Sequence, residues 1–255
     1  MLEYPIAFGS AAESHNHSLN TLNALFEYDD FMMSIDSVID VGCGDGLDLE
    51  WWATRTTRDD NPVPLDIDCV GLDLRPELSV ARHYANMSYL HGDFEEPYYG
   101  SKKFDIVWSH DSFQYALDPF ATLRNFHTML TPGGMLVLIL PQTTNMVYNQ
   151  QAFEQLDGVY HNYTLVSLIH LLAVCGFDCK AGFFLKNPDD PWLHAVVYKA
   201  DVDFKAPRTT RWFDLMDAEL LPETAEKSIN LCGHVRQKDL ILPWLTKSAI
   251  DYGQQ

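Results

Sequence analysis

Short apolar runs alternate along the chain with segments in which apolar residues recur at helical spacing. A run of about four to eight apolar residues between turn residues is typical of a buried strand. We therefore expect strands at residues 37–41, 69–74, 88–91, 104–109, 135–140, 179–185 and 193–198.

The segments between these runs favour helices, which are predicted around residues 19–26, directly after residue 46, from Pro76, over 118–130 and over 164–174. Strands that alternate with helices predict a parallel, doubly wound α/β sheet. The last two strands are separated only by the turn at 187–191, which predicts an antiparallel hairpin at one edge of the sheet. Residues 200–255 show no strand pattern and favour a helical extension.

The net charge of −19 narrows the range of partners. An acidic surface repels phosphate backbones, so the charge disfavours nucleic acid as a substrate. The other interpretation is that the acidity only maintains solubility. With 255 residues, of which 47% are hydrophobic, the chain can build its core without disulfides or metal ions.

The five cysteines are irregularly spaced and form no CxxC pair, so neither a zinc site nor a disulfide framework is predicted. His15 and His17 have no third ligand nearby in the sequence, and no metal is expected. The N-terminal segment lacks the basic and apolar parts of a signal peptide. The longest apolar run, 135–140, is far shorter than the ~20 residues of a membrane span. These features predict a cytoplasmic protein.

The most informative segment is the turn DVGCGDG at residues 40–46, between a predicted strand and a predicted helix. Glycines at such a turn let backbone N–H groups approach a ligand closely. A dinucleotide fingerprint would place its third glycine at position 47, which is Leu47, and no GK[ST] follows to indicate a phosphate-binding loop. GxGxG behind an acid instead suits S-adenosylmethionine, which carries a zwitterionic methionine tail and a cationic sulfonium. The alternative is a turn that only connects strand and helix.

Asp73 ends the second predicted strand, where an α/β sheet presents its ligand contacts. A carboxylate at this position can accept hydrogen bonds from both ribose hydroxyls. Taken alone, it would be interpreted as a solvated strand-end residue.

Five segments in this order, VIDVGCGDG, VGLDL, HGDFEE, FDIVWSHDSFQYALDP and LTPGGMLVLILP, resemble the successive motifs of class I, Rossmann-like, S-adenosylmethionine-dependent methyltransferases. The resemblance covers roughly residues 35–200. It implies a doubly wound, mostly parallel seven-stranded sheet with a terminal antiparallel hairpin and helices on both faces. The cofactor-binding residues that it implies are Asp40, Gly42, Gly44, Asp45 and Gly46 for the methionine portion, Asp73 with Leu74 for the ribose, Asp93 with Phe94 for the adenine, and Ser109 towards the reactive methyl group.

Methyl transfer needs little covalent chemistry from a protein, because the sulfonium already activates the methyl carbon. Some acceptors need a general base, and His110 is the candidate by residue type and position. The alternative is a histidine that packs or bonds to the cofactor. Gln114 and Tyr115 follow on the same loop and are expected to orient an acceptor. No NPPY-like tetrapeptide follows the fourth strand, which disfavours base amines as acceptors.

The resemblance divides the chain into an N-terminal helical lid segment (1–34), a methyltransferase domain (35–200) and a helical C-terminal extension (201–255). The leading hypothesis is methyl transfer to a small-molecule acceptor. The alternatives are a protein or tRNA methyltransferase and a non-catalytic regulator or scaffold that binds S-adenosylmethionine. Trp51 and Trp52 would suit a homodimer interface. The sequence specifies neither the acceptor nor the methylated atom.

Overall fold

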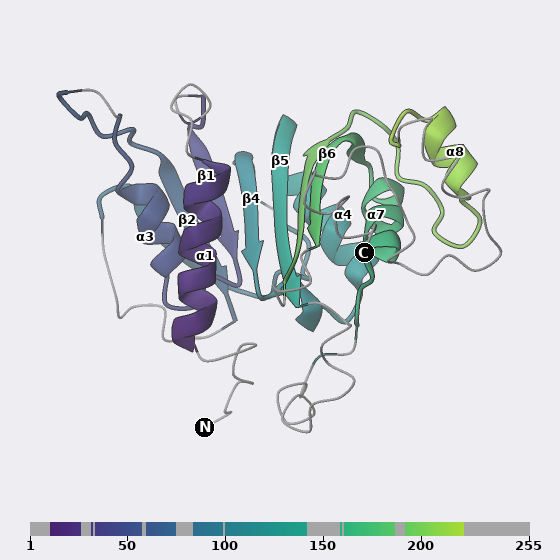
Figure 1. Ribbon diagram of the computed structural model, residues 1–255, viewed down its shortest axis with the longest axis horizontal. Helices are drawn as coiled ribbons and strands as arrows, with labels where there is room; N and C mark the ends of the chain where they lie inside the picture. Colours follow the sequence, from purple (N-terminus) through teal and green to yellow (C-terminus); the bar gives the residue numbers. More distant parts are fainter. Residues whose placement is uncertain are drawn as a thin grey trace, which may run out of the picture.

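A seven-stranded sheet with the strand order β3-β2-β1-β4-β5-β7-β6 forms the centre of the molecule (Figure 1). The computed structural model describes residues 11–26, 32, 34–57, 60–74, 84–98, 100–141, 159, 161–186 and 192–221. The strands are β1 (Ser37–Val41), β2 (Asp68–Asp73), β3 (Met87–His91), β4 (Phe104–His110), β5 (Leu130–Pro141), β6 (Phe177–Lys186) and β7 (Trp192–Lys199).

The direction of the strands confirms the predicted architecture. Strands β1 to β5 pair in parallel, whereas β7 pairs antiparallel with both β5 and β6. The sheet is therefore mostly parallel and ends in an antiparallel hairpin. The predicted turn at 187–191 and the helix predicted from Pro76 lie outside the described residues.

Helices cover both faces of the sheet, as predicted. One face carries α1 (Ala11–Leu25) and α3 (Leu47–Ala53), and the other carries α4 (Pro119–Met129) and α7 (Leu165–Val174), with the short α8 (Trp212–Asp217) beside α7. Side chains of a strand alternate between its two faces. Val38 accordingly packs under α1 and α3, whereas Ile39 and Val41 pack under α4 and α7.

Strand β5 is longer than the predicted run at 135–140. It begins at Leu130, which is fully buried and pairs with Phe104, and the pairing then shifts before Ile106 meets Met135. The strand predicted at 135–140 is therefore too short at its amino-terminal end. Burial of Leu130 extends the strand through an irregularity that Gly133, at φ 73°, accommodates.

Both long helices on the α4 side begin where the sequence predicts. The Asp118 carboxylate accepts the backbone N–H groups of Phe120 and Ala121 and caps α4, and Pro119 occupies its first turn. Thr164 and Ser167 form a capping box at the start of α7. These caps satisfy backbone donors that a helix start otherwise leaves unpaired.

The segments outside the predicted central domain also pack on the sheet. Leu22 and Phe26 from the predicted lid segment are buried against Trp52 and Trp108. On the other side, Leu215, Leu220 and Leu221 are buried in the cluster below α7. The boundaries at 34 and 200 stay predictions, and residues 222–255 lie outside the described part.

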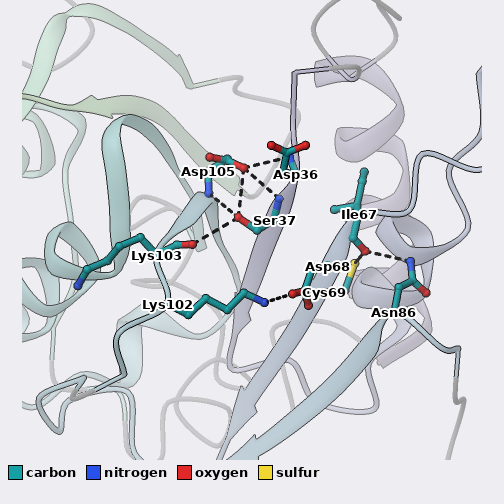
Figure 2. A network of polar contacts seen from close by, with 9 residues as sticks. All are labelled: Asp36, Ser37, Ile67, Asp68, Cys69, Asn86, Lys102, Lys103 and Asp105. Atoms are coloured by element: carbon teal, nitrogen blue, oxygen red, sulfur yellow. Dashed lines mark hydrogen bonds and ion pairs between the residues drawn. The ribbon is translucent and has the colours of Figure 1, made fainter.

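The amino-terminal ends of the central strands are tied together by polar side chains (Figure 2). One oxygen of the Asp105 carboxylate accepts the backbone N–H groups of Asp36 and Ser37 at 3.0 Å each, and the Ser37 hydroxyl at 3.1 Å. Lys102 forms an ion pair with Asp68 at the start of β2. This network closes one end of the sheet and leaves the carboxyl end for ligand contacts. Among the described residues, no helix is long and apolar enough to cross a membrane.

Candidate cofactor and acceptor site

The glycine turn lies between β1 and α3 at the carboxyl end of the sheet. Gly42, Gly44 and Gly46 have φ values of 76°, 54° and 74°, in the left-handed region that favours glycine. The N–H of Gly42 donates to the Leu72 carbonyl at 2.7 Å, and that of Gly46 to the Cys43 carbonyl at 2.9 Å. The turn is thereby fastened to the end of β2.

Neighbouring side chains leave no room for a Cβ atom in this turn. A Cβ at Gly42 would lie 2.3 Å from the Cβ of Ser112, and one at Gly46 would lie 2.2 Å from the hydroxyl of Tyr89. The Ser112 hydroxyl donates to the Val41 carbonyl at 2.7 Å. Ser112 in the loop after β4 and Tyr89 of β3 therefore pack directly against the turn. Positions 42 and 46 have no space for a side chain.

Asp40 lies near the end of β1 and is buried. Burial raises the pKa of its carboxyl well above the ordinary value, and the nearby acids Asp48 and Asp73 raise the pKa further. A buried carboxylate of this kind gains from a cationic partner. Asp40 is thus suited to a ligand that brings an ammonium group.

Asp48, on the first turn of α3, is a second acid near the turn that the sequence reasoning missed, and it is partly buried. One of its oxygens accepts hydrogen bonds from the Ser18 hydroxyl and, at 2.9 Å, from the Trp108 indole N–H. Burial raises the pKa of Asp48, while these two bonds and the nearby His15 and His17 lower it. Asp48 follows Gly46 by two residues and so could be noticed in the sequence. Its hydrogen-bond donors lie on α1 and β4, far away in the chain, and could not be predicted.

Asp73 stands at the carboxyl end of β2, as predicted. Its Oδ2 accepts the Gly44 N–H at 2.9 Å, so the strand end and the glycine turn are directly bonded. Leu74 follows and is exposed, and its carbonyl lies 2.8 Å from Nε2 of His91. Asp45 lies exposed on the turn itself. The geometry brings Asp40, Asp73 and the three glycines to one edge of the sheet.

Asp93 and Phe94 follow β3 and differ in their surroundings. The Asp93 carboxylate accepts the Glu95 N–H at 2.9 Å and shapes the loop. The Phe94 ring is buried and packs on Phe126, with ring centroids 6.1 Å apart. The Phe94 carbonyl also accepts a bond from the Asn125 amide. The adenine role of these two residues stays a prediction.

Ser109, at the end of β4, is fully buried. Its hydroxyl lies 2.6 Å from that of Ser112, the residue that presses on Gly42. In this structure Ser109 supports the loop over the turn. The predicted role of Ser109 towards a methyl group has no direct support in this geometry.

His110 ends β4 and is half-buried among aromatic rings. Its Nε2 lies 3.0 Å from Nδ1 of His17 on α1. The Trp192 ring lies 4.9 Å from His110 and 5.0 Å from His17, and the His194 ring lies 5.1 Å from His17. We call these four residues, His17, His110, Trp192 and His194, the histidine cluster.

The register of the sheet explains the histidine cluster. Ile139 of β5 pairs with His110 on one side and with His194 on the other, so the two histidines lie on one row across three strands. Sequence reasoning missed this row because it joins β4 to β7, which are far apart in the chain.

A hydrogen bond between two of its own side chains holds the loop after His110. The Gln114 amide donates to Asp111 at 2.6 Å, and the Gln114 side chain is buried. Burial raises the pKa of the Tyr115 hydroxyl to about 12, and Asp111 adds to that rise. The predicted role of Gln114 and Tyr115 in orienting an acceptor stays a prediction.

Trp51 and Trp52 are buried against each other and against Phe26. Their proposed place in a homodimer interface is therefore wrong, because α1 covers them within one chain. Cys175 and Cys179 are buried core residues.

Comparison with known proteins agrees with this geometry. A family model described as a methyltransferase domain matches residues 39–138. A malonyl-[acyl-carrier protein] O-methyltransferase of Yersinia pestis is 27% identical over 175 residues, which are 67% of this chain and 62% of that protein. A ubiquinone biosynthesis O-methyltransferase of Ruegeria pomeroyi is 31% identical over 106 residues, 39% of each chain. The chain thus spans less than two thirds of the length of these curated relatives.

A solved structure shares the fold. Phosphoethanolamine N-methyltransferase 2 of Haemonchus contortus, determined with S-adenosyl-L-methionine, superposes with a TM-score of 0.57 at 14% identity, covering 78% of this chain and 55% of that one. The strand order, the glycine turn and the family match agree with one another. Residues 39–138 match the methyltransferase-domain family, and the seven-stranded sheet has the class I, Rossmann-like fold of S-adenosylmethionine-dependent methyltransferases.

Proposed function

We propose that this protein binds S-adenosylmethionine at the glycine turn and transfers its methyl group to a small-molecule acceptor. One observation carries the proposal. Three left-handed glycines, the buried Asp40 and the strand-end Asp73 meet at the carboxyl end of adjacent strands. This is the position at which a doubly wound sheet binds its ligands.

The residues present fit the cofactor. The glycine turn would hold the methionine portion, and Asp40 would receive its ammonium group. Asp73 would accept the ribose hydroxyls, with the exposed Leu74 beside it. When bound, the cofactor supplies a methyl group activated by its sulfonium, and the protein positions the acceptor and excludes water.

His110 would lie on the acceptor side, at the end of β4 and next to the loop that presses on the turn. As a half-buried imidazole it is suited to take a proton from an acceptor at neutral pH. The net charge of −19 supports a small molecule over a nucleic acid. Two of the named relatives are O-methyltransferases, which supports oxygen as the methylated atom.

Calorimetric titration of the purified protein with S-adenosylmethionine, and separately with NAD, tests the cofactor site. We expect micromolar affinity for S-adenosylmethionine and no binding of NAD. Absence of S-adenosylmethionine binding would overturn the proposal.

A panel of small hydroxyl and amine compounds, assayed for release of S-adenosylhomocysteine, then tests methyl transfer. Binding without turnover on any acceptor would favour a regulator or scaffold. Turnover only on tRNA or a protein would replace the small-molecule acceptor.

A further inference from the structure

The contact between His17 and His110 couples the positions of the protons on the two rings. Nδ1 of His17 and Nε2 of His110 are 3.0 Å apart, a hydrogen-bond distance. A neutral imidazole carries a proton on one nitrogen and a lone pair on the other. One ring must therefore donate across this contact and the other must accept, so the tautomers of the two histidines are coupled.

Only one of the two arrangements leaves His110 able to act as a base. If His17 donates from Nδ1, the lone pair of His110 Nε2 is used in the contact and His110 Nδ1 carries a proton. If His110 donates from Nε2, its Nδ1 carries the lone pair. We propose that His17 is a positioning residue that accepts the Nε2 proton of His110 and so holds His110 Nδ1 ready to take a proton from the acceptor.

The surroundings hold the two rings in place. Trp192 stacks on His17 with an angle of 21° between the rings and also contacts His110, while His194 meets His17 edge-on. The rings come from α1, β4 and β7, so three separate elements fix their orientation. A base that is oriented before the reaction avoids the cost of ordering during it.

An acidic side chain lies close to His17. Asp48 lies within electrostatic reach of His15 and His17, and its own hydrogen bonds to Ser18 and Trp108 keep it in place. The bond from a charged His110 to His17 becomes stronger than the neutral one.

This inference rests on the proposed function and specifies its acceptor. In the step, the proton of the acceptor atom moves to His110 Nδ1, the electron pair of that atom bonds to the methyl carbon, and the carbon–sulfur bond breaks with its pair left on sulfur. Such a base is useful only where the attacking atom carries a proton. The acceptor class is therefore a hydroxyl or a protonated nitrogen, rather than an ionised carboxylate.

The tautomer can be measured without cofactor or acceptor. In protein labelled with 15N-histidine, long-range 1H–15N correlation spectra show which ring nitrogen carries the proton, and His110→Gln identifies the signals of His110. We expect His110 protonated on Nε2 in the wild type and a mixture of both tautomers in His17→Phe. His17→Asn places an amide oxygen near the position of Nδ1 and should restore the wild-type tautomer.

His15→Phe is the control, since His15 interacts with Asp48 and not with His110. A proton on Nδ1 of His110 in the wild type, or an unchanged tautomer in His17→Phe, would overturn the role of His17. The first of these outcomes needs only the wild-type spectrum, so it can overturn the proposal even if a variant does not fold. Failure of the proposed function would show separately, as loss of S-adenosylmethionine binding in the wild type.

Discussion

Gly42 faces Ser112 at a distance that excludes any side chain at position 42, because a Cβ there would lie 2.3 Å from the Ser112 Cβ. Ser112 cannot move aside freely, since its hydroxyl is bonded to Val41 and Ser109. The shape of the glycine turn is thus set by the loop after β4.

Gly42→Ala should destabilise the protein by about 2–4 kcal/mol, from left-handed strain and overpacking together. Gly133→Ala is a matched control, because Gly133 has nearly the same φ (73° against 76°) but nothing within 4 Å of its Cβ position. That control should lose only the strain of about 1–2 kcal/mol. The free energy of unfolding in urea measures both, and equal losses would show that Ser112 exerts no steric constraint.

Ser112→Gly should partly rescue Gly42→Ala, because it removes the atom that the new Cβ would strike. The double variant would then be more stable than the sum of the two single losses predicts, which is a coupling between neighbours. Strict additivity would contradict the contact.

Asp73→Ala should weaken S-adenosylmethionine binding about 10- to 100-fold, the equivalent of one lost charge-assisted hydrogen bond of about 1.5–3 kcal/mol. Asp73→Asn keeps an oxygen for the Gly44 N–H and should lose less. Calorimetric titration measures the dissociation constants. An unchanged affinity in Asp73→Ala would remove Asp73 from the ribose site.

Asp40 should make the folded protein less stable as the pH rises. Because its folded pKa is raised above that of the unfolded chain, the folded state holds an extra proton between the two values. Stability attributable to this group is therefore present below the unfolded pKa and declines as the pH rises towards the folded pKa. Asp40→Asn removes this decline.

Urea unfolding of the wild type and Asp40→Asn at pH 5, 6, 7 and 8 tests whether Asp40 lowers the free energy of unfolding as the pH rises. The variant should gain stability relative to the wild type as the pH rises towards the folded pKa of Asp40, and its affinity for S-adenosylmethionine should be lower than that of the wild type. A stability difference that stays constant across the series would show that Asp40 has an ordinary pKa.

The positions of the strands could be predicted from the sequence because buried parallel strands are continuous apolar runs. Residues 37–41 match β1 residue for residue, and the other predicted strands differ from the observed ones mainly at their ends. The early start of β5 at Leu130 was not predicted, because Pro132 and the two glycines after it are typical of a turn rather than of a strand. Pairing with Phe104 overrides that local signal.

The site was predictable where its residues follow one another in a motif. The glycine turn and Asp73 belong to short segments whose spacing carries the information. The contact between His17 and His110 spans 93 residues and depends on how α1 crosses the sheet, which no local pattern encodes. The burial of Trp52 under Phe26 depends on the same crossing, and the sequence alone therefore suggested an interface instead.

His110→Gln should lower turnover about 10²- to 10⁴-fold if His110 is a general base. Glutamine keeps a polar group near the position of Nε2, so the contact with His17 is retained while the base is lost. Affinity for S-adenosylmethionine should stay within about twofold of the wild type. Turnover is measured by S-adenosylhomocysteine release on an acceptor from the panel, and equal losses of turnover and affinity would make His110 a binding residue.

Asp105→Ala should lower the stability of the fold without changing the affinity for S-adenosylmethionine. Asp105 accepts hydrogen bonds from Asp36 and Ser37 (Figure 2) and from Thr131, at the amino end of the sheet and far along the strands from the glycine turn. Its removal leaves the donors of the buried Ser37 without their acceptor and should cost about 1–3 kcal/mol. Lys102→Ala, which breaks a half-exposed ion pair with Asp68, should cost less than about 1 kcal/mol.

Neither Asp105→Ala nor Lys102→Ala should change S-adenosylmethionine affinity at a temperature where both variants remain folded. Urea unfolding and calorimetric titration on the same preparations measure the two quantities. If Asp105→Ala instead weakened the cofactor without destabilising the fold, the amino-terminal network would be coupled to the glycine turn through β1. The division of the sheet into a structural end and a binding end would then be wrong.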